Sequence, residues 1–331
     1  MFRTAVVALG GNAILKEGEK GTIPEQIRNV VKSLDGILFL IREGYNLALT
    51  HGNGPQAGDE VIRVERTRDE VPELSLDVID AATQGWMGYL IGQALMNRLL
   101  LEKINRRVIT LPTQVTVDLA DPSFQNPTKP IGPFYTKDEA ERLKERGILL
   151  REDSGRGFRR VVPSPFPKEI VEKETIRQLV EDGVIVIAVG GGGTPVLRQN
   201  DGTLHGVEGV IDKDRASAVL ARDIEAESLF FLTSVDQVFL HYGKPNQVAI
   251  SEITSKEAQK YLKEGHFPTG SMGPKIEAAI QFLESGGTEV IITSIENSEK
   301  AFQGVGGTRI VARAGVWVDS LFPPQNKLSA D

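Results

Sequence analysis

The sequence predicts an α/β fold built around a mainly parallel β-sheet, and three observations support that prediction. Apolar runs rich in β-branched residues recur along the 331 residues, and segments with a helical period lie between them. Glycine-rich turns follow several of the runs, as expected where a strand passes into a helix. The composition, 40% apolar and 25% charged, is ordinary for a globular protein that is large enough for one big unit or two fused lobes.

The predicted strands and helices alternate along the chain. The strands are residues 4–9, 46–51, 108–111, 184–189, 228–232 and 289–292. The helices are residues 24–42, 77–103, 169–181, 213–222 and 274–285. A strand followed by a helix is the repeating unit of parallel sheets, so this pattern predicts that the strands are mainly parallel.

Residues 117–167 interrupt this alternation and are predicted to form a small inserted subdomain. The segment is dense in proline, and Thr136 with Glu139 makes a capping box for a short helix. Residues 149–152 and 158–162 are predicted strands of a hairpin, joined by a turn at 154–157. The tail from 319 onward is predicted to be a surface extension.

Composition excludes several classes of function. The chain has no cysteine, so thiolate metal sites and cysteine nucleophiles are impossible, and its four histidines follow no ligand pattern. No run of about 20 apolar residues and no signal pattern occurs, so we expect a cytoplasmic protein without a membrane partner. The net charge of −7 disfavours nucleic acid as a partner.

Three glycine-rich turns follow predicted strands. They are Gly10-Gly11-Asn12, Gly52-Asn53-Gly54 and the run of four glycines at 190–193, which includes Gly191 and Gly192. Glycine allows the backbone to approach a ligand, and bare N–H groups at a helix start bind anions. Turns at the carboxyl ends of parallel strands meet at one edge of the sheet, which predicts a phosphate site there. Any one of these turns could be purely structural, but all three together favour a ligand.

Two common phosphate motifs are absent. A P-loop needs Ser or Thr after Gly-Lys, but Pro245 follows Lys244, and Pro274 separates Gly273 from Lys275. The first glycine turn lacks the spacing of a dinucleotide fingerprint, and the run at 190 lacks its last glycine. These departures argue against an NAD-dependent dehydrogenase.

Three lysines stand in unusual settings. Lys129 lies in a proline-stiffened loop, and Lys213 and Lys275 open predicted helices. A cation in the first turn opposes the helix dipole, so an anionic ligand would explain both positions. Phosphoryl transfer needs such cations around the migrating group. Asp212 is predicted to be an N-cap, and Asp214 is either a second cap or the residue that holds the lysines in register.

A nucleotide site is predicted after the strand at 228–232. Ser234 and the loop that follows could hold adenine and ribose, with Tyr242 stacking on the base or packing in the core. Residues 84–89 put small and aromatic side chains on an apolar helix, which favours close helix packing, within the fold or between subunits, over a ligand site.

Eight segments of the chain resemble the carbamate kinases of the amino acid kinase superfamily. They are residues 8–13, 50–56, 126–135, 152–157, 162–165, 210–214 and 270–275, together with the glycine run at 190–193. The resemblance covers residues 5 to about 310. The segments around Lys129 and Ser154 are the specific part, because they belong to the inserted subdomain.

The resemblance implies a fold and an activity. The fold is an open αβα sandwich, with an acceptor lobe at 1–205 that contains the insertion and a nucleotide lobe at 206–318. The reaction is reversible, Mg²⁺-dependent transfer of phosphoryl between ATP and carbamate, giving ADP and carbamoyl phosphate. The usual assembly is a homodimer, and Mg²⁺ is held mainly by the nucleotide phosphates and not by protein ligands.

The resemblance also assigns roles to residues. Lys129, Lys213 and Lys275 would stabilise the transferred group, and Asp214 would organise them. The acceptor and its phosphoryl group would contact Gly10, Gly11, Asn12, Gly52, Asn53, Gly54, Gly191 and Gly192. The nucleotide would lie against Ser234, Tyr242, Lys244, Met272 and Gly273.

Two alternatives remain at this stage. One is a related kinase with another acceptor, such as acetylglutamate, glutamate or a nucleoside monophosphate. The other is a silent ATP-binding regulator on the same scaffold. The inserted subdomain argues against the first, and retention of the three lysines with Asp214 argues against the second.

Overall fold

The structure is a computed structural model that describes residues 3–313 except 17, 154 and 269. Its centre is an eight-stranded sheet in the order β15-β17-β16-β12-β1-β2-β9-β3. Neighbouring strands are parallel except for the antiparallel pair β16 and β17. The strands are β1 (Thr4–Leu9), β2 (Asn46–His51), β3 (Val108–Thr110), β9 (Ile185–Ile187), β12 (Ser228–Thr233), β15 (Glu252–Thr254), β16 (Glu289–Ser294) and β17 (Thr308–Val311). The prediction of a mainly parallel sheet is confirmed.

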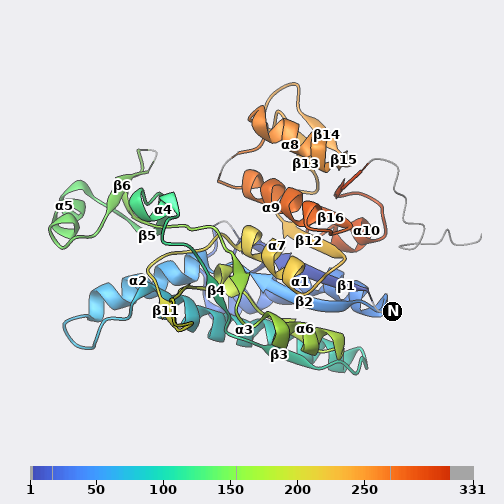
Figure 1. Ribbon diagram of the computed structural model, residues 1–331, viewed down its shortest axis with the longest axis horizontal. Coiled ribbons are helices and arrows are strands. Elements are labelled where there is room, and N and C mark those ends of the chain that lie inside the picture. The colour runs from blue at the N-terminus through green and yellow to red at the C-terminus, as the bar shows by residue number, and fades with distance from the viewer. Residues whose placement is uncertain (1–2, 17, 154, 269, 314–331) are drawn as a thin grey trace, which may run out of the picture.

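Helices cover both faces of this sheet (Figure 1). Strand β1 shows why, because Val6 and Ala8 join one apolar cluster while Val7 and Leu9 join the other. One layer holds α1 (Ile23–Arg42), α3 (Leu76–Leu101) and α10 (Ser298–Phe302). The opposite layer holds α6 (Lys173–Glu181), α7 (Lys213–Asp223), α8 (Ser255–Lys263) and α9 (Met272–Glu284). Strands with two buried faces need apolar residues at every position, which is the pattern seen in the sequence.

The structure differs from the predicted elements at several places, and three of them lie near the glycine turns or the inserted segment. Residues 169–170 form strand β8 (Glu169–Ile170) instead of a first helical turn, because they pair with β4 (Gln114–Thr116). Strand β9 is shorter than predicted because the chain turns at Val189, with φ of 54°, into the 3-10 turn η2 (Gly190–Gly192). Helix α2 (Gly54–Thr67) was not predicted.

The segment predicted as an insertion leaves the body after β4 and returns at β8, its antiparallel neighbour. It contains α4 (Pro122–Gln125), β5 (Lys129–Tyr135), α5 (Lys137–Glu145), β6 (Leu150–Glu152) and β7 (Phe158–Val162). The predicted capping box at Thr136 and the hairpin of β6 and β7 are present, although position 154 in its turn lies outside the described residues. Figure 1 shows α5 and β6 projecting away from the main sheet. We call residues 117–167 the inserted subdomain.

Smaller elements complete the molecule. Strands β10 (Thr194–Arg198) and β11 (Leu204–Gly206) extend the small sheet that contains β4 and β8. A hairpin of β13 (Val238–Leu240) and β14 (Val248–Ile250) follows β12. Among the described residues no helix is long and apolar enough to cross a membrane. The tail predicted at 319–331 lies outside the described residues.

Candidate active site

The glycine turns meet at the carboxyl ends of the central strands, where they border a cavity of about 370 Å³. Backbone hydrogen bonds fix the turns to the sheet: Gly10 N donates to Leu232 O at 2.8 Å, and Gly52 N donates to Leu9 O at 3.3 Å. The predicted site residues that line this reaction cavity are Gly10, Gly11, Gly52, Asn53, Gly54, Lys129, Gly191, Lys213, Asp214, Ser234 and Lys275. Segments far apart in the sequence thus supply one site.

Close contacts limit the space for a side chain at two of these glycines. A Cβ atom at Gly52 would lie 3.1 Å from Cδ of Lys213, whose side chain passes over this turn. Gly191 has φ of +66°, and a Cβ there would lie 2.2 Å from the side-chain amide of Asn53. A larger residue at Gly191 would therefore be strained and would displace Asn53.

Asp214 lies between two lysines. Lys213 Nζ donates to Oδ1 of Asp214 at 2.7 Å, and Lys275 Nζ donates to Oδ2 at 2.9 Å. Asp214 and Lys275 are buried, with exposed fractions of 4% and 8%. Charged groups with this little solvent are tolerated when they are paired, so the carboxylate fixes both ammonium groups at the cavity wall.

The pKa values of the three groups follow from this pairing. Burial raises the pKa of Asp214, but the two lysines more than offset it and hold the carboxyl below its ordinary value. Burial lowers the pKa of Lys275, and the charge of Lys213 lowers it further. For Lys213 burial is outweighed by Asp214, and its pKa is raised. Of the two lysines, Lys275 is therefore the one that loses its proton more easily.

Lys129 reaches the cavity from the inserted subdomain. Its Nζ lies 3.3 Å from Oδ2 of Asp212, while Oδ1 of Asp212 accepts from the backbone N–H groups of Asp214 and Arg215. The prediction that Asp212 caps helix α7 is confirmed. Its second role, as a partner for Lys129, could not be seen in the sequence because the two residues are 83 positions apart.

A second, smaller pocket of about 170 Å³ adjoins the reaction cavity. Both cavities share Thr233, Ser234, Ser271 and Lys275. Of the residues predicted to contact the nucleotide, Ser234, Tyr242 and Met272 line the pocket. Phe239 and Phe267, which the sequence did not single out, lie in its wall and give it apolar character. A flat apolar base fits such a wall.

Some predicted residues fall outside the two cavities. Lys244 is exposed and does not line the pocket, and neither does Gly273, where a Cβ would lie 3.0 Å from Pro268 O. Gly192 packs against Ile211 O, 2.4 Å from where its Cβ would be. Asn12 contributes backbone to the 3-10 turn η1 (Gly11–Ala13), and its side chain lies outside the described part.

His51 lies behind the glycine turns and is 1% exposed. Burial lowers its pKa to about 4, although its Nδ1 lies 3.1 Å from Gly52 O. The imidazole is therefore neutral at pH 7. A Cβ at Gly190 would meet its Nε2 at 2.5 Å, so the ring fills space beneath the turn.

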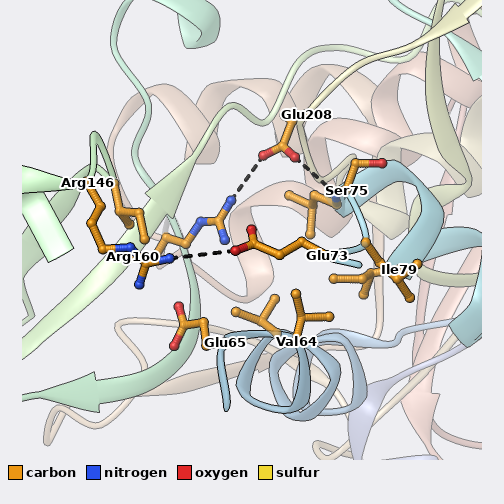
Figure 2. A pocket seen from close by; sticks show the side chains of 12 residues that line it. Val64, Glu65, Glu73, Ser75, Ile79, Arg146, Arg160 and Glu208 are labelled. Carbon is orange, nitrogen blue, oxygen red and sulfur yellow. Dashed lines mark hydrogen bonds and ion pairs between the residues drawn. The ribbon is translucent and has the colours of Figure 1, made fainter. Parts of the chain in front are cut away.

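A further cavity of about 320 Å³ separates the inserted subdomain from α2 and α3 (Figure 2). Val61, Val64, Leu76 and Ile79 form its apolar side. Two ion pairs cross it: Arg160 Nη2 lies 3.0 Å from Glu208, and Arg146 Nη2 lies 3.9 Å from Glu73. The other oxygen of Glu208 accepts from Leu76 N at 3.1 Å, at the start of α3. Glu208 thus connects the inserted subdomain to the body, four residues before Asp212.

Comparisons with known proteins agree with this architecture. Residues 3–294 match the model of the amino acid kinase family. The chain is 48% identical over 313 residues to the carbamate kinase of Pyrococcus horikoshii, covering 94% of this chain and 99% of that protein. It is 45% identical to the carbamate kinase of Clostridium perfringens, covering 92% and 99%. The solved structure of the Giardia lamblia carbamate kinase bound to AMP-PNP matches with a TM-score of 0.89 at 42% identity, covering 94% and 98%.

Proposed function

The chain belongs to the amino acid kinase family and, within it, to the carbamate kinases; from this premise we propose that it transfers phosphoryl reversibly between Mg·ATP and carbamate. The products are ADP and carbamoyl phosphate. The observation that carries the proposal is the pairing of Lys213 and Lys275 on Asp214, beside bare glycine amides at one cavity. Positive potential held in place before the reaction is what a migrating phosphoryl group requires.

The mechanism is direct in-line transfer. Lys213 and Lys275 neutralise charge on the equatorial oxygens of the phosphoryl group, and Lys129 closes the cluster from the inserted subdomain. Asp214 is not a base in this scheme, because its depressed pKa and two lysine partners keep it ionised and engaged. Carbamate is already an anion and needs no base, which agrees with the neutral, buried state of His51.

The nucleotide occupies the pocket beside the reaction cavity, with its base between Tyr242, Phe239 and Met272. Ser271 and Lys275 line both the pocket and the reaction cavity. The phosphates of the nucleotide would therefore extend through this junction toward the acceptor. Mg²⁺ enters with the nucleotide as part of the substrate. The carboxylates at the site, Asp212 and Asp214, already serve lysines and a helix N-terminus, so the phosphates are the better ligands for the ion.

The two lobes have separate tasks in this proposal. Residues 1–205 hold the acceptor and residues 206–318 hold the nucleotide. The inserted subdomain is a lid, since it carries Lys129 to the cavity and is joined to the body across the cavity of Figure 2. If an enzyme without residues 117–167 folded and kept full activity, the subdomain would not be a lid. We expect the enzyme to act in the cytoplasm.

A homodimer is proposed through α3. Positions 78, 82, 85, 89, 93, 96 and 100 lie on one face of this helix, and four of them carry large, exposed apolar side chains. These are Val78, Tyr89, Met96 and Leu100, with exposed fractions of 44%, 58%, 48% and 77%. Strand β3, at the edge of the main sheet, adds Ile109. A self-complementary apolar face of this kind suits a second copy around a two-fold axis.

The test of the activity is ATP formation from carbamoyl phosphate and Mg·ADP, followed with luciferase. We expect ATP in proportion to carbamoyl phosphate consumed. Folded protein that forms no ATP from it, but phosphorylates acetylglutamate or glutamate, would be a kinase with another acceptor. Binding of nucleotide without turnover on any acceptor would indicate a regulator.

A further inference from the structure

A buried hydrogen-bond network behind the acceptor side of the cavity fixes the orientation of Asn53. The side-chain nitrogen of Asn53 donates to Thr83 Oγ1 at 2.9 Å and to Asp80 Oδ1 at 3.3 Å. All three residues are buried, with exposed fractions of 2% for Asn53, 0% for Thr83 and 2% for Asp80. The proposed phosphoryl transfer makes no use of Asp80 or Thr83.

Thr83 determines which end of the Asn53 amide faces it. A hydroxyl has one hydrogen, and Thr83 Oγ1 donates that hydrogen to Asp80 O at 2.9 Å. The same oxygen can therefore only accept from Asn53, so the NH₂ group of the amide must point toward α3. A flipped amide would place two acceptors against each other in a buried position, which is costly.

The remaining polar atom of the Asn53 side chain is its carbonyl oxygen. Both amide hydrogens are engaged, and Oδ1 accepts no hydrogen bond from any residue in the described part of the chain. Asn53 lines the reaction cavity, and the absence of a Cβ at Gly191 lets its amide lie against the backbone there. The network thus presents one fixed acceptor to the acceptor substrate.

This inference rests on the proposed function, because it concerns how the acceptor is recognised. The negatively charged end of carbamate, or the phosphoryl group of carbamoyl phosphate, is attracted to Lys213 and its neighbours. The NH₂ group carries no negative charge and needs an acceptor when it is removed from water. We propose that Asn53, oriented by Thr83 and Asp80, accepts a hydrogen bond from this NH₂ group and so selects carbamate over carboxylates of the same shape that lack a donor.

Acetyl phosphate is the matched probe, since a methyl group replaces the NH₂ group of carbamoyl phosphate. A site with a buried acceptor should reject it, because the Asn53 carbonyl would be desolvated without a partner. We expect kcat/KM of the wild-type enzyme with Mg·ADP to be on the order of 10²-fold higher for carbamoyl phosphate. Equal values for the two substrates would overturn the inference without any variant.

Thr83→Val tests the positioning role. The change keeps the shape of the side chain and removes the hydroxyl, so the Asn53 amide loses its fixed orientation. We expect the preference for carbamoyl phosphate to fall about tenfold, through loss of kcat/KM for carbamoyl phosphate, with acetyl phosphate changed about twofold or less. Thr83→Ser should restore the preference. A merely structural role would lower both activities together and leave the ratio intact, and that result would overturn the assignment.

Two further variants complete the test. Thr293→Val makes the same chemical change at a fully buried residue whose hydroxyl has no partner among the described residues, and should leave the ratio unchanged. Asn53→Leu removes the acceptor itself, and it decides the question if Thr83→Val does not fold: loss of the preference supports the inference, and an unchanged preference refutes it. Absence of ATP formation from carbamoyl phosphate by the wild-type enzyme would instead count against the proposed function.

Discussion

Nζ of Lys275 lies 2.9 Å from Oδ2 of Asp214. Lys275 is the fourth residue of α9, a helix whose N-terminus repels a cation. Lys213 occupies the first position of α7 and binds the other oxygen of the same carboxylate. One aspartate therefore holds two lysines where the helix dipoles oppose them. Such an arrangement makes physical sense when an anion binds between the helices, and it motivates the first two predictions.

Lys275→Ala is expected to lower kcat on the order of 10²-fold or more, the cost of deleting one donor that is aimed at transition-state charge. Folding should survive, because Asp214 keeps Lys213 as a partner. The measurement is the steady-state rate of ATP formation from carbamoyl phosphate. Lys300→Ala, at an exposed position on α10, is the control and should behave as wild type. Turnover near that of wild type in Lys275→Ala would mean that this lysine has been assigned wrongly.

The depressed pKa of Lys275 predicts a pH dependence. Burial and the charge of Lys213 favour the neutral amine, so Lys275 loses its proton below the ordinary lysine value of about 10.4. We expect kcat/KM, which reports on the free enzyme, to fall on the alkaline side with a midpoint below that value. Lys275→Arg keeps its charge at these pH values and should move the fall to higher pH. If the two profiles have the same midpoint, another group is titrating.

Local chemistry was predictable from the sequence where it depended on neighbours. The capping box at Thr136 and the cap at Asp212 need only residues within one turn, and both are present. The contact between Lys129 and Asp212 depends on how a projecting subdomain folds back, which no local pattern encodes. The role of Thr83 was equally hidden, because a threonine on an apolar helix is ordinary until its partner Asn53 is known.

One error in the predicted elements and the placement of one predicted site residue have the same origin. Residues 169–170 have helical neighbours in the sequence, but pairing with β4 makes them a strand. Lys244, which lies between β13 and β14, does not line the pocket, and its contact with the nucleotide stays a prediction. In both cases tertiary pairing decided the outcome, and local propensity was the weaker influence.

Glu208→Gln should weaken the attachment of the inserted subdomain. The amide oxygen can still accept from Leu76 N, but the charge that binds Arg160 is lost. Arg160 pairs with Ile131 in the sheet, and Ile131 is two positions after Lys129 on the same strand. A more loosely attached subdomain would therefore hold Lys129 less firmly over the cavity. A partly exposed ion pair is worth at most about 1 kcal/mol, so we expect KM for carbamoyl phosphate to rise about 2- to 5-fold, more than kcat changes.

The control for Glu208→Gln is Glu225→Gln, which breaks the ion pair with Arg177. That pair joins α6 to the residues that follow α7, and neither side chain has a hydrogen bond or ion pair with a described residue of the inserted subdomain. It should leave KM as in wild type. If KM is unchanged in Glu208→Gln as well, the ion pair between Glu208 and Arg160 does not contribute to acceptor binding.

Leu100→Asp is expected to weaken the proposed dimer. Its side chain is 77% exposed in the isolated chain, so a charge there costs the monomer little, whereas burial of an unpaired carboxylate between two copies is costly. Light scattering coupled to size-exclusion chromatography should show half the mass of the wild-type particle at micromolar concentration. Val305→Asp, at a site 65% exposed away from α3, is the matched control and should remain dimeric. A dimer that persists in Leu100→Asp would move the interface elsewhere.

Asp80→Asn is expected to change how stability depends on pH. Burial raises the pKa of Asp80 well above its ordinary value, and the nearby Asp77 and Glu208 raise it further, against the opposing hydrogen bond from Asn53. The folded state therefore binds this proton more tightly than the unfolded state, and the wild-type enzyme loses stability as pH rises above about 3.9, by about 1.4 kcal/mol per unit of pKa difference. Asparagine does not titrate, so the melting temperature of Asp80→Asn minus that of wild type should increase from pH 4 to pH 7.

Asp182→Asn, at an exposed position, should give a flat difference. A flat difference for Asp80→Asn too would mean that Asp80 is ionised in the folded enzyme, and that its contact with Asn53 is a charged hydrogen bond.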